Sequence, residues 1–152
     1  LDNLSELLRF EPGLAPQVTE YLIKYCAHGP KARANVRAAI NDVLNQDIIS
    51  TWQAMWIAHA LGYVRRLRGS RPAAYLDWLA HCVATGPDGL AATACASLGR
   101  LNYGDPAAIA AAVDRIGPEW RPLALWGLAR IDQPKAADSV DNQIDRIMLG
   151  AT

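Results

Sequence analysis

Apolar residues recur every three or four positions through most of the chain, and this spacing predicts amphipathic helices. The most apolar stretch is 48–67, which carries no charged residue before Arg65 and is apolar on nearly every side of a helix. A helix of that kind is usually the buried centre of an all-helical domain. We therefore expect 48–67 to form the central helix, with other helices packed on both sides of it.

Helix boundaries are marked by a recurring dipeptide. Gly-Pro occurs at 29–30, 86–87 and 117–118. Glycine permits the exit from one helix, and proline, which has no amide hydrogen, suits the first turn of the next. Asp105 before Pro106 adds a capping residue at a further helix start. Together with the apolar spacing, these signals predict an all-α fold of about nine helices with short links and no strand.

A similar phrase recurs near the ends of three predicted helices: HALGYVRRL, CASLGRL and LWGLARI. Aligned, Leu61-Gly62, Leu98-Gly99 and Leu128-Ala129 correspond, at spacings of 37 and 30 residues. Repeats of this length with two helices per unit are typical of a helical solenoid, in which each unit buries its apolar face against its neighbours. An irregular helical bundle is the alternative architecture.

The paired helices, with their Gly-Pro starts and small-residue inner helices, resemble HEAT-like α-solenoid repeats over most of the chain. That resemblance implies a short right-handed α-solenoid of antiparallel helix pairs. The opening segment LSELLRFEPGLAPQVTEYL, residues 4–22, is similar to the start of the helical-repeat tail behind the polymerase domain of some bacterial reverse-transcriptase-like proteins, including phage-defence types. The Tyr-x-Asp-Asp signature of those polymerases is absent from the chain. This second resemblance implies a non-catalytic accessory module, the C-terminal part of an RNA-directed DNA polymerase.

Length and terminal sequence set the domain organisation. The 152 residues suit a single helical-repeat domain, 1–152. The opening LDNLSELL has neither an initiator methionine nor a secretion signal, so we expect a fragment of a longer chain. Three cysteines, an odd number, lie within apolar helical patterns, which favours buried thiols in a cytoplasmic protein. They are Cys26, Cys82 and Cys95.

A membrane-spanning interpretation of 48–67 has to be weighed, because about 20 apolar residues can cross a bilayer. Polar residues interrupt the stretch, and no second apolar stretch of that length follows. We therefore expect no membrane association. The interrupting residues are Ser50, Thr51, Gln53, His59 and Gly62.

Charge is balanced overall but uneven along the chain. Fifteen basic side chains match fifteen acidic ones, so there is no global field that would draw the protein to nucleic acid. Residues 1–76 hold nine Lys and Arg against six Asp and Glu, whereas residues 77–152 hold six against nine. Any anion-binding surface should therefore lie in the first half.

One group of basic residues, which we call the basic corner, is a candidate phosphate site. Four arginines fall within seven residues at the end of the predicted central helix and after it, and three basic residues belong to the preceding helix. Guanidinium groups in a glycine-containing loop can bind phosphates with salt-dependent affinity. The alternative is that these cations offset a helix dipole and are solvated. The basic corner consists of Arg65, Arg66, Arg68, Arg71, Arg33, Arg37 and Lys31.

Catalytic and metal-binding patterns were also sought. Cys26 with His28, and His81 with Cys82, are close in sequence, but on a helix these spacings point to different faces. Asp77 and His81 share a face, yet no nucleophile accompanies them. We therefore expect no cofactor, no metal and no enzymatic activity in this segment.

The tryptophans allow two interpretations. Trp52 and Trp56 lie one turn apart, and Trp120 and Trp126 flank Pro122. Such rings can form a stacking platform for bases or a peptide groove. At helical spacing, however, core packing is the usual role, and we expect it here, with Trp120 the best candidate for exposure because it lies in a polar first turn.

Two functional hypotheses follow. In the first, the chain is a non-catalytic helical scaffold that supports RNA or DNA backbone binding through the basic corner. In the second, it is a scaffold for protein-protein interaction or self-association that binds no nucleic acid.

Overall fold

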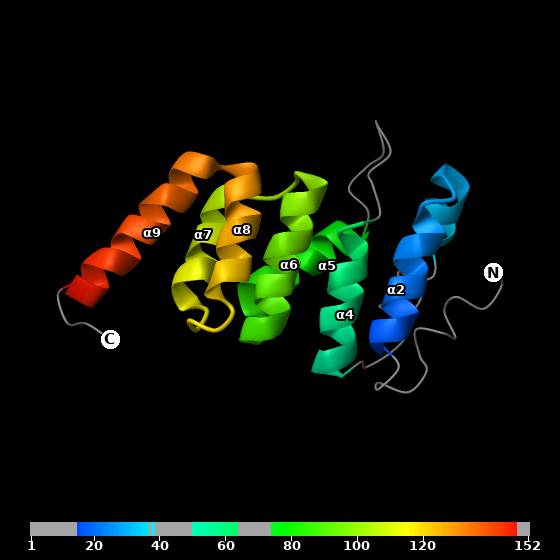
Figure 1. Cartoon of the computed structure of the whole chain (residues 1–152), viewed down its shortest axis with the longest axis horizontal. Coiled ribbons are helices and arrows are strands. Elements are labelled where there is room, and N and C mark those ends of the chain that lie inside the picture. Colours follow the sequence, from blue (N-terminus) through cyan, green and yellow to red (C-terminus); the bar gives the residue numbers. More distant parts are fainter. Residues whose placement is uncertain (1–14, 37, 39–49, 64–73, 149–152) are drawn as a thin grey trace.

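A computed structural model describes residues 15–36, 38, 50–63 and 74–148, and all regular structure in these ranges is helical (Figure 1). The all-α prediction is therefore confirmed. Residues 30–36 are helical and follow the first helix closely. The helices with defined bounds are α2 (Ala15–Cys26), α4 (Thr51–Leu61), α5 (Ala74–Thr85), α6 (Asp88–Leu101), α7 (Pro106–Arg115), α8 (Arg121–Ile131) and α9 (Gln133–Met148).

The helices form two layers (Figure 1). In the front layer α2 packs on α4, α4 on α6, and α6 on α8, so that each helix contacts the helix two places further along the chain. Behind them α5 packs on α6, while α7 packs on α8 and α5. The last helix, α9, packs on α7 and α8 at the end of the array opposite α2.

The central helix of this fold is α6. Ten consecutive residues, 90–99, are buried, because α6 contacts α4 and α8 at its sides and α5 behind. The expectation that 48–67 would be the centre was wrong for its described part. Helix α4 carries apolar residues both on the face that packs in the core and on a second face that is open to solvent. On the open side Trp52 is 45% exposed, and Tyr63, just beyond the helix, is 38% exposed.

Small residues on α6 allow its neighbours to approach to backbone contact. A Cβ added to Gly99 would lie 2.8 Å from the Cα of Gly127 on α8. On the other side, the Ser97 hydroxyl donates a hydrogen bond to the carbonyl oxygen of Ala58 on α4. The front layer is therefore held together along both flanks of α6.

The predicted helix starts are confirmed at 29–30, 86–87 and 105–106, whereas α8 begins at Arg121, three residues after Pro118. Gly29 has φ +122° and is followed by a helical segment that begins at Pro30. Asp105 caps α7, because its Oδ1 accepts from the Ala107 amide at 3.0 Å. Helix α4, however, begins at Thr51 rather than 48, since Ser50 and Gln53 form a reciprocal capping box at its start.

The three cysteines are buried, as predicted, with 5%, 4% and 0% exposure for Cys26, Cys82 and Cys95. None of the described helices combines the length and the apolar character needed to cross a bilayer. At the far end of the array, α9 leaves one apolar side open. Its exposed apolar residues are Val140, Ile144, Ile147 and Met148.

Candidate functional site

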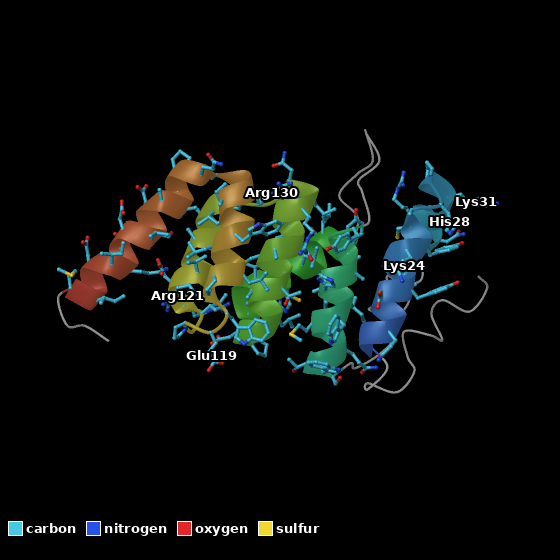
Figure 2. The ribbon with its side chains drawn as sticks, in the orientation of Figure 1. Lys24, His28, Lys31, Glu119, Arg121 and Arg130 are labelled. Atoms are coloured by element: carbon cyan, nitrogen blue, oxygen red, sulfur yellow. The ribbon has the colours of Figure 1, made fainter. Side chains whose placement is uncertain are left out.

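Most of the basic corner lies outside the described residues: Arg37, Arg65, Arg66, Arg68 and Arg71. Of its two described members, Lys31 is exposed, and Figure 2 shows it with Lys24 and His28 at the α2 end of the molecule. Arg33 is half-buried and its Nη1 donates to the Cys26 carbonyl oxygen at 3.4 Å. Arg33 thus satisfies the C-terminal end of α2 and is less available to a phosphate than its sequence context suggested.

A row of aromatic rings runs along the open side of α4. Trp52, Trp56, His59 and Tyr63 follow each other at three and four residues, which places them on one helix face. Successive ring centroids are 5.7, 5.8 and 5.4 Å apart, and each pair is arranged edge to face. This geometry is favourable for aromatic pairs. The row is therefore a packed unit that still exposes Trp52 and Tyr63.

Two arginines extend this row across α6 and α8. The Arg100 guanidinium lies over the Tyr63 ring at 4.9 Å and over the Trp126 ring at 5.2 Å. Arg130 lies over the same Trp126 ring at 5.5 Å, and Figure 2 shows it at the upper end of the front layer. Trp126 itself is 43% exposed. We call this surface the aromatic face; it consists of Trp52, Trp56, His59, Tyr63, Arg100, Trp126 and Arg130.

Three residues of the aromatic face occupy the same position in the repeated sequence motif. Tyr63, Arg100 and Arg130 each follow the aligned dipeptide by one residue, near the ends of α4, α6 and α8. At the same spacings, Trp56 and His59 of α4 correspond to the small residues Thr93 and Ala96 of α6. Because α6 carries small side chains where its neighbour carries large ones, the surface is hollow above α6.

A pocket occupies that hollow, with a volume of about 260 Å³. Helix α6 forms its floor, and side chains of α4 and α8 form its walls. Most of the lining is carbon. The lining residues are Met55, Trp56, His59, Thr93, Ala96, Arg100, Trp120 and Leu123.

Few polar groups in the pocket are free to meet a ligand. The Thr93 hydroxyl already donates to the Gly89 carbonyl oxygen at 2.7 Å. Arg100 is different: its Nη1 is buried, and no oxygen of the described residues accepts a hydrogen bond from it. No described carboxylate lies within ion-pair distance of Arg100 either. Arg100 therefore brings to the pocket a positive charge that no described carboxylate compensates, although its buried Nη1 is closed to a ligand.

His59 adds no second charge at neutral pH. Burial lowers the pKa of its imidazole below the ordinary value of about 6.5, and the nearby positive charge of Arg100 lowers it further. A neutral imidazole has one donor and one acceptor nitrogen. Arg100 is thus the charged group of the pocket.

Other arginines of the front and rear layers have structural roles. On α7, Arg115 donates through Nη2 to the Val83 carbonyl oxygen at 2.7 Å and through Nη1 to that of Ala84, at the end of α5. Arg121 donates to the Ile116 carbonyl oxygen at 2.8 Å, just after α7. Such bonds satisfy helix C-termini. Arg100 and Arg130 instead lie over exposed aromatic rings, in contrast to Arg115 and Arg121, which bond to backbone carbonyl oxygens at helix ends.

Two observations on the described residues concern the catalytic and metal-binding patterns considered from the sequence. His81 Nε2 lies 3.2 Å from the Thr85 hydroxyl on its own helix, but this hydroxyl donates to the His81 carbonyl oxygen at 2.9 Å. Within the described ranges, no three His, Cys, Asp or Glu side chains come together as a metal site would require.

The aromatic face was missed by the sequence-based expectation that the tryptophans lie in the core. Trp52 and Trp126 are exposed, and Trp56 and Trp120 are half-buried in the pocket wall. The signal was present in the repeat: Arg100 and Arg130 stand at corresponding positions, and two arginines at one repeat position indicate a solvent-facing surface.

No protein-family model, curated protein or solved structure matches the chain. The aromatic face and its pocket are therefore the observations on which a functional proposal rests.

Proposed function

We propose that the chain is a non-catalytic scaffold for protein-protein interaction, and that the aromatic face is the surface to which a partner binds. The observation that carries this proposal is that two exposed indoles adjoin lining residues of an apolar pocket: Trp52 packs on Trp56, and Trp126 lies under the Arg100 guanidinium. Tryptophan, tyrosine and arginine are enriched among the residues that contribute most to binding at protein interfaces. The aromatic face contains all three.

We also propose that the architecture is a short right-handed α-solenoid of antiparallel, HEAT-like helix pairs. Its support is the contact of each front helix with the helix two places along the chain, from α2 to α8. The correspondence of Tyr63, Arg100 and Arg130 supports it as well. In such arrays one layer of helices often provides the binding surface.

Selection of peptides tests the interaction proposal without a known partner. A random peptide library that presents both internal segments and free C-termini is selected on the wild-type protein. We expect enriched peptides that still bind in 0.5 M NaCl, because apolar burial is not screened by salt. Their binding should weaken at least tenfold in the double variant Trp52→Ala, Trp126→Ala and stay unchanged in Lys24→Ala on α2. Failure to enrich any peptide, or equal binding to the double variant, would exclude the aromatic face as a partner site.

A second candidate function is nucleic-acid backbone binding by an accessory module of a reverse-transcriptase-like protein. The exposed Lys31, with Lys24 and His28 nearby, favours it (Figure 2). This hypothesis predicts sequence-independent binding of RNA or DNA that weakens steeply with salt. If the double variant Arg65→Glu, Arg68→Glu binds nucleic acid as the wild type does, the basic corner has no such role. A Tyr-x-Asp-Asp motif encoded upstream of Leu1 would support the polymerase relationship.

A further inference from the structure

The size of the pocket limits its occupant. Its volume of about 260 Å³ lies below the roughly 300–1,000 Å³ of pockets for drug-sized ligands. The walls are the rings of Trp56 and Trp120 with the side chains of Met55 and Leu123. A group that fills this space is on the scale of one large apolar side chain.

The positive charge of Arg100 favours a ligand that carries an anionic group next to the apolar side chain in the pocket. The Arg100 guanidinium is held between the Tyr63 and Trp126 rings, at 4.9 and 5.2 Å. Arg100 lines the pocket, and no described carboxylate forms an ion pair with it. A carboxylate or a phosphate of a ligand would compensate the charge of Arg100, because both anions match the planar fork of a guanidinium.

The lining argues against a nucleotide in this position. The polar edge of a base inserted here would face Met55, Ala96 and Leu123, and its donors and acceptors would lose their water partners without replacement. A phosphate alone would leave the apolar walls uncovered. The ligand that satisfies both features is an apolar side chain on the same residue as a carboxylate.

We propose that the pocket binds the C-terminal residue of a partner protein, with the apolar side chain between α4 and α8 and the terminal carboxylate on Arg100. A chain terminus is the place in a protein where a free carboxylate and an apolar side chain share one residue; the side chains of Asp and Glu offer no such apolar group. This inference rests on the proposed function, since it specifies which part of a partner the aromatic face receives. Capture of a terminal carboxylate is an established mode of peptide recognition.

The test uses acetyl-Ala-Ala-Leu with a free carboxylate and the same peptide with a C-terminal amide. Titration of the wild-type protein, followed by intrinsic tryptophan fluorescence and by NMR chemical shifts, gives the two dissociation constants. We expect the acid to bind at least tenfold more tightly than the amide. Arg100→Gln should abolish this preference, whereas Arg130→Gln, whose side chain does not line the pocket, should keep it. A urea unfolding curve for each variant verifies that it is folded.

The alternative outcomes are distinct. Equal binding of acid and amide would overturn the carboxylate assignment and leave the proposed function in place. If neither peptide binds, the carboxylate assignment is overturned as well. The peptide-library selection, which also presents internal segments, then decides whether the aromatic face binds proteins at all. Binding of adenosine monophosphate with displacement of the acid peptide would overturn it in favour of a nucleotide site. The comparison of acid with amide on the wild-type protein does not depend on any variant folding.

Discussion

Gly127 of α8 lies directly against α6, where a Cβ on Gly99 would come within 2.8 Å of the Gly127 Cα. The reverse addition is less tolerable: a Cβ on Gly127 would clash with the carbonyl group of Cys95. Both obstacles are backbone atoms, which cannot move aside as a side-chain end can. The spacing of α6 and α8, and with it the position of the two pocket walls, depends on these glycines.

Gly127→Ala should therefore destabilise the protein by about 2 kcal/mol or more, since overpacking of a dense core typically costs roughly 1–3 kcal/mol. Urea unfolding followed by circular dichroism measures the change. Gly62→Ala is the graded comparison, because its nearest obstacle is the Ser97 hydroxyl at 2.9 Å, and we expect a smaller loss. An unchanged unfolding midpoint for Gly127→Ala would contradict the close contact of α6 with α8.

His59 should contribute a pH dependence to stability. Its pKa is lowered in the folded state by burial and by Arg100, whereas in the unfolded state it is near the ordinary value of about 6.5. Below pH 6.5 the unfolded chain binds more protons at this site than the folded chain, so stability falls as the pH drops from about 6.5 through the folded-state pKa. Above pH 6.5 the contribution of His59 is constant. Unfolding curves of the wild type and of His59→Gln between pH 5 and pH 8 measure it.

The variant Arg100→Gln should change the pKa of His59. Removal of the positive charge should raise the pKa of His59, but burial is the larger cause and should keep it below about 6.5. An NMR titration of the imidazole measures the shift, with Arg130→Gln as the control for loss of an arginine over Trp126. If the pKa of His59 is unchanged by Arg100→Gln, the charge of Arg100 does not influence the imidazole, which would contradict this expectation.

The buried thiols should resist modification in the native protein. Burial raises the pKa of Cys82 to about 12 and that of Cys95 to about 12, and these thiols are 4% and 0% exposed. The thiolate is the reactive species, so a disulfide reagent at pH 8 should react far more slowly with the folded protein than with the protein in urea. Fast labelling of Cys95 under native conditions would mean that α6 is not the centre of the fold.

Arg115 should stabilise the fold through its bonds to the end of α5. Its guanidinium donates to the carbonyl oxygens of Val83 and Ala84, and hydrogen bonds from charged donors contribute more than neutral ones. We expect Arg115→Gln to cost about 1 kcal/mol, a discounted value because part of the contact is open to solvent. Lys24→Gln removes an exposed ion pair with Glu20, at 3.3 Å, and should change stability far less. Equal effects of the two substitutions would argue against a capping role for Arg115.

Local features of the fold could be predicted from the sequence because they depend on neighbouring residues. The caps at Asp105 and the turn at Gly29 need a few positions only, and both are confirmed. The identity of the central helix could not be predicted from apolar length. Helix α4 is apolar because its core face and its open aromatic face both carry apolar side chains, whereas α6 is buried because its small residues admit neighbours on each side.

The aromatic face depends on relationships that sequence spacing gives only indirectly. Arg100 meets Tyr63 and Trp126 across three helices, and these partners lie 37 and 26 positions away in the sequence. The alignment of the repeat placed Tyr63, Arg100 and Arg130 at one position, but it could not show that α6 is recessed between its neighbours. The arginines at 65–71 lie outside the described residues, so their phosphate-binding role stays a prediction.

Indole NMR signals test the partner site most directly, because four of the five tryptophans lie on the aromatic face or in the pocket wall and the fifth lies on α5. The tightest peptide from the library selection is added to ¹⁵N-labelled protein, and single Trp→Phe variants assign the Nε1–H signals. We expect the signals of Trp52, Trp56 and Trp126 on the aromatic face, and of Trp120 in the pocket wall, to shift as the peptide saturates the protein. The signal of Trp78 on α5, in the rear layer, should stay in place. A shift confined to Trp78, or saturation with no shift of the aromatic-face tryptophans, would contradict a partner site on this surface.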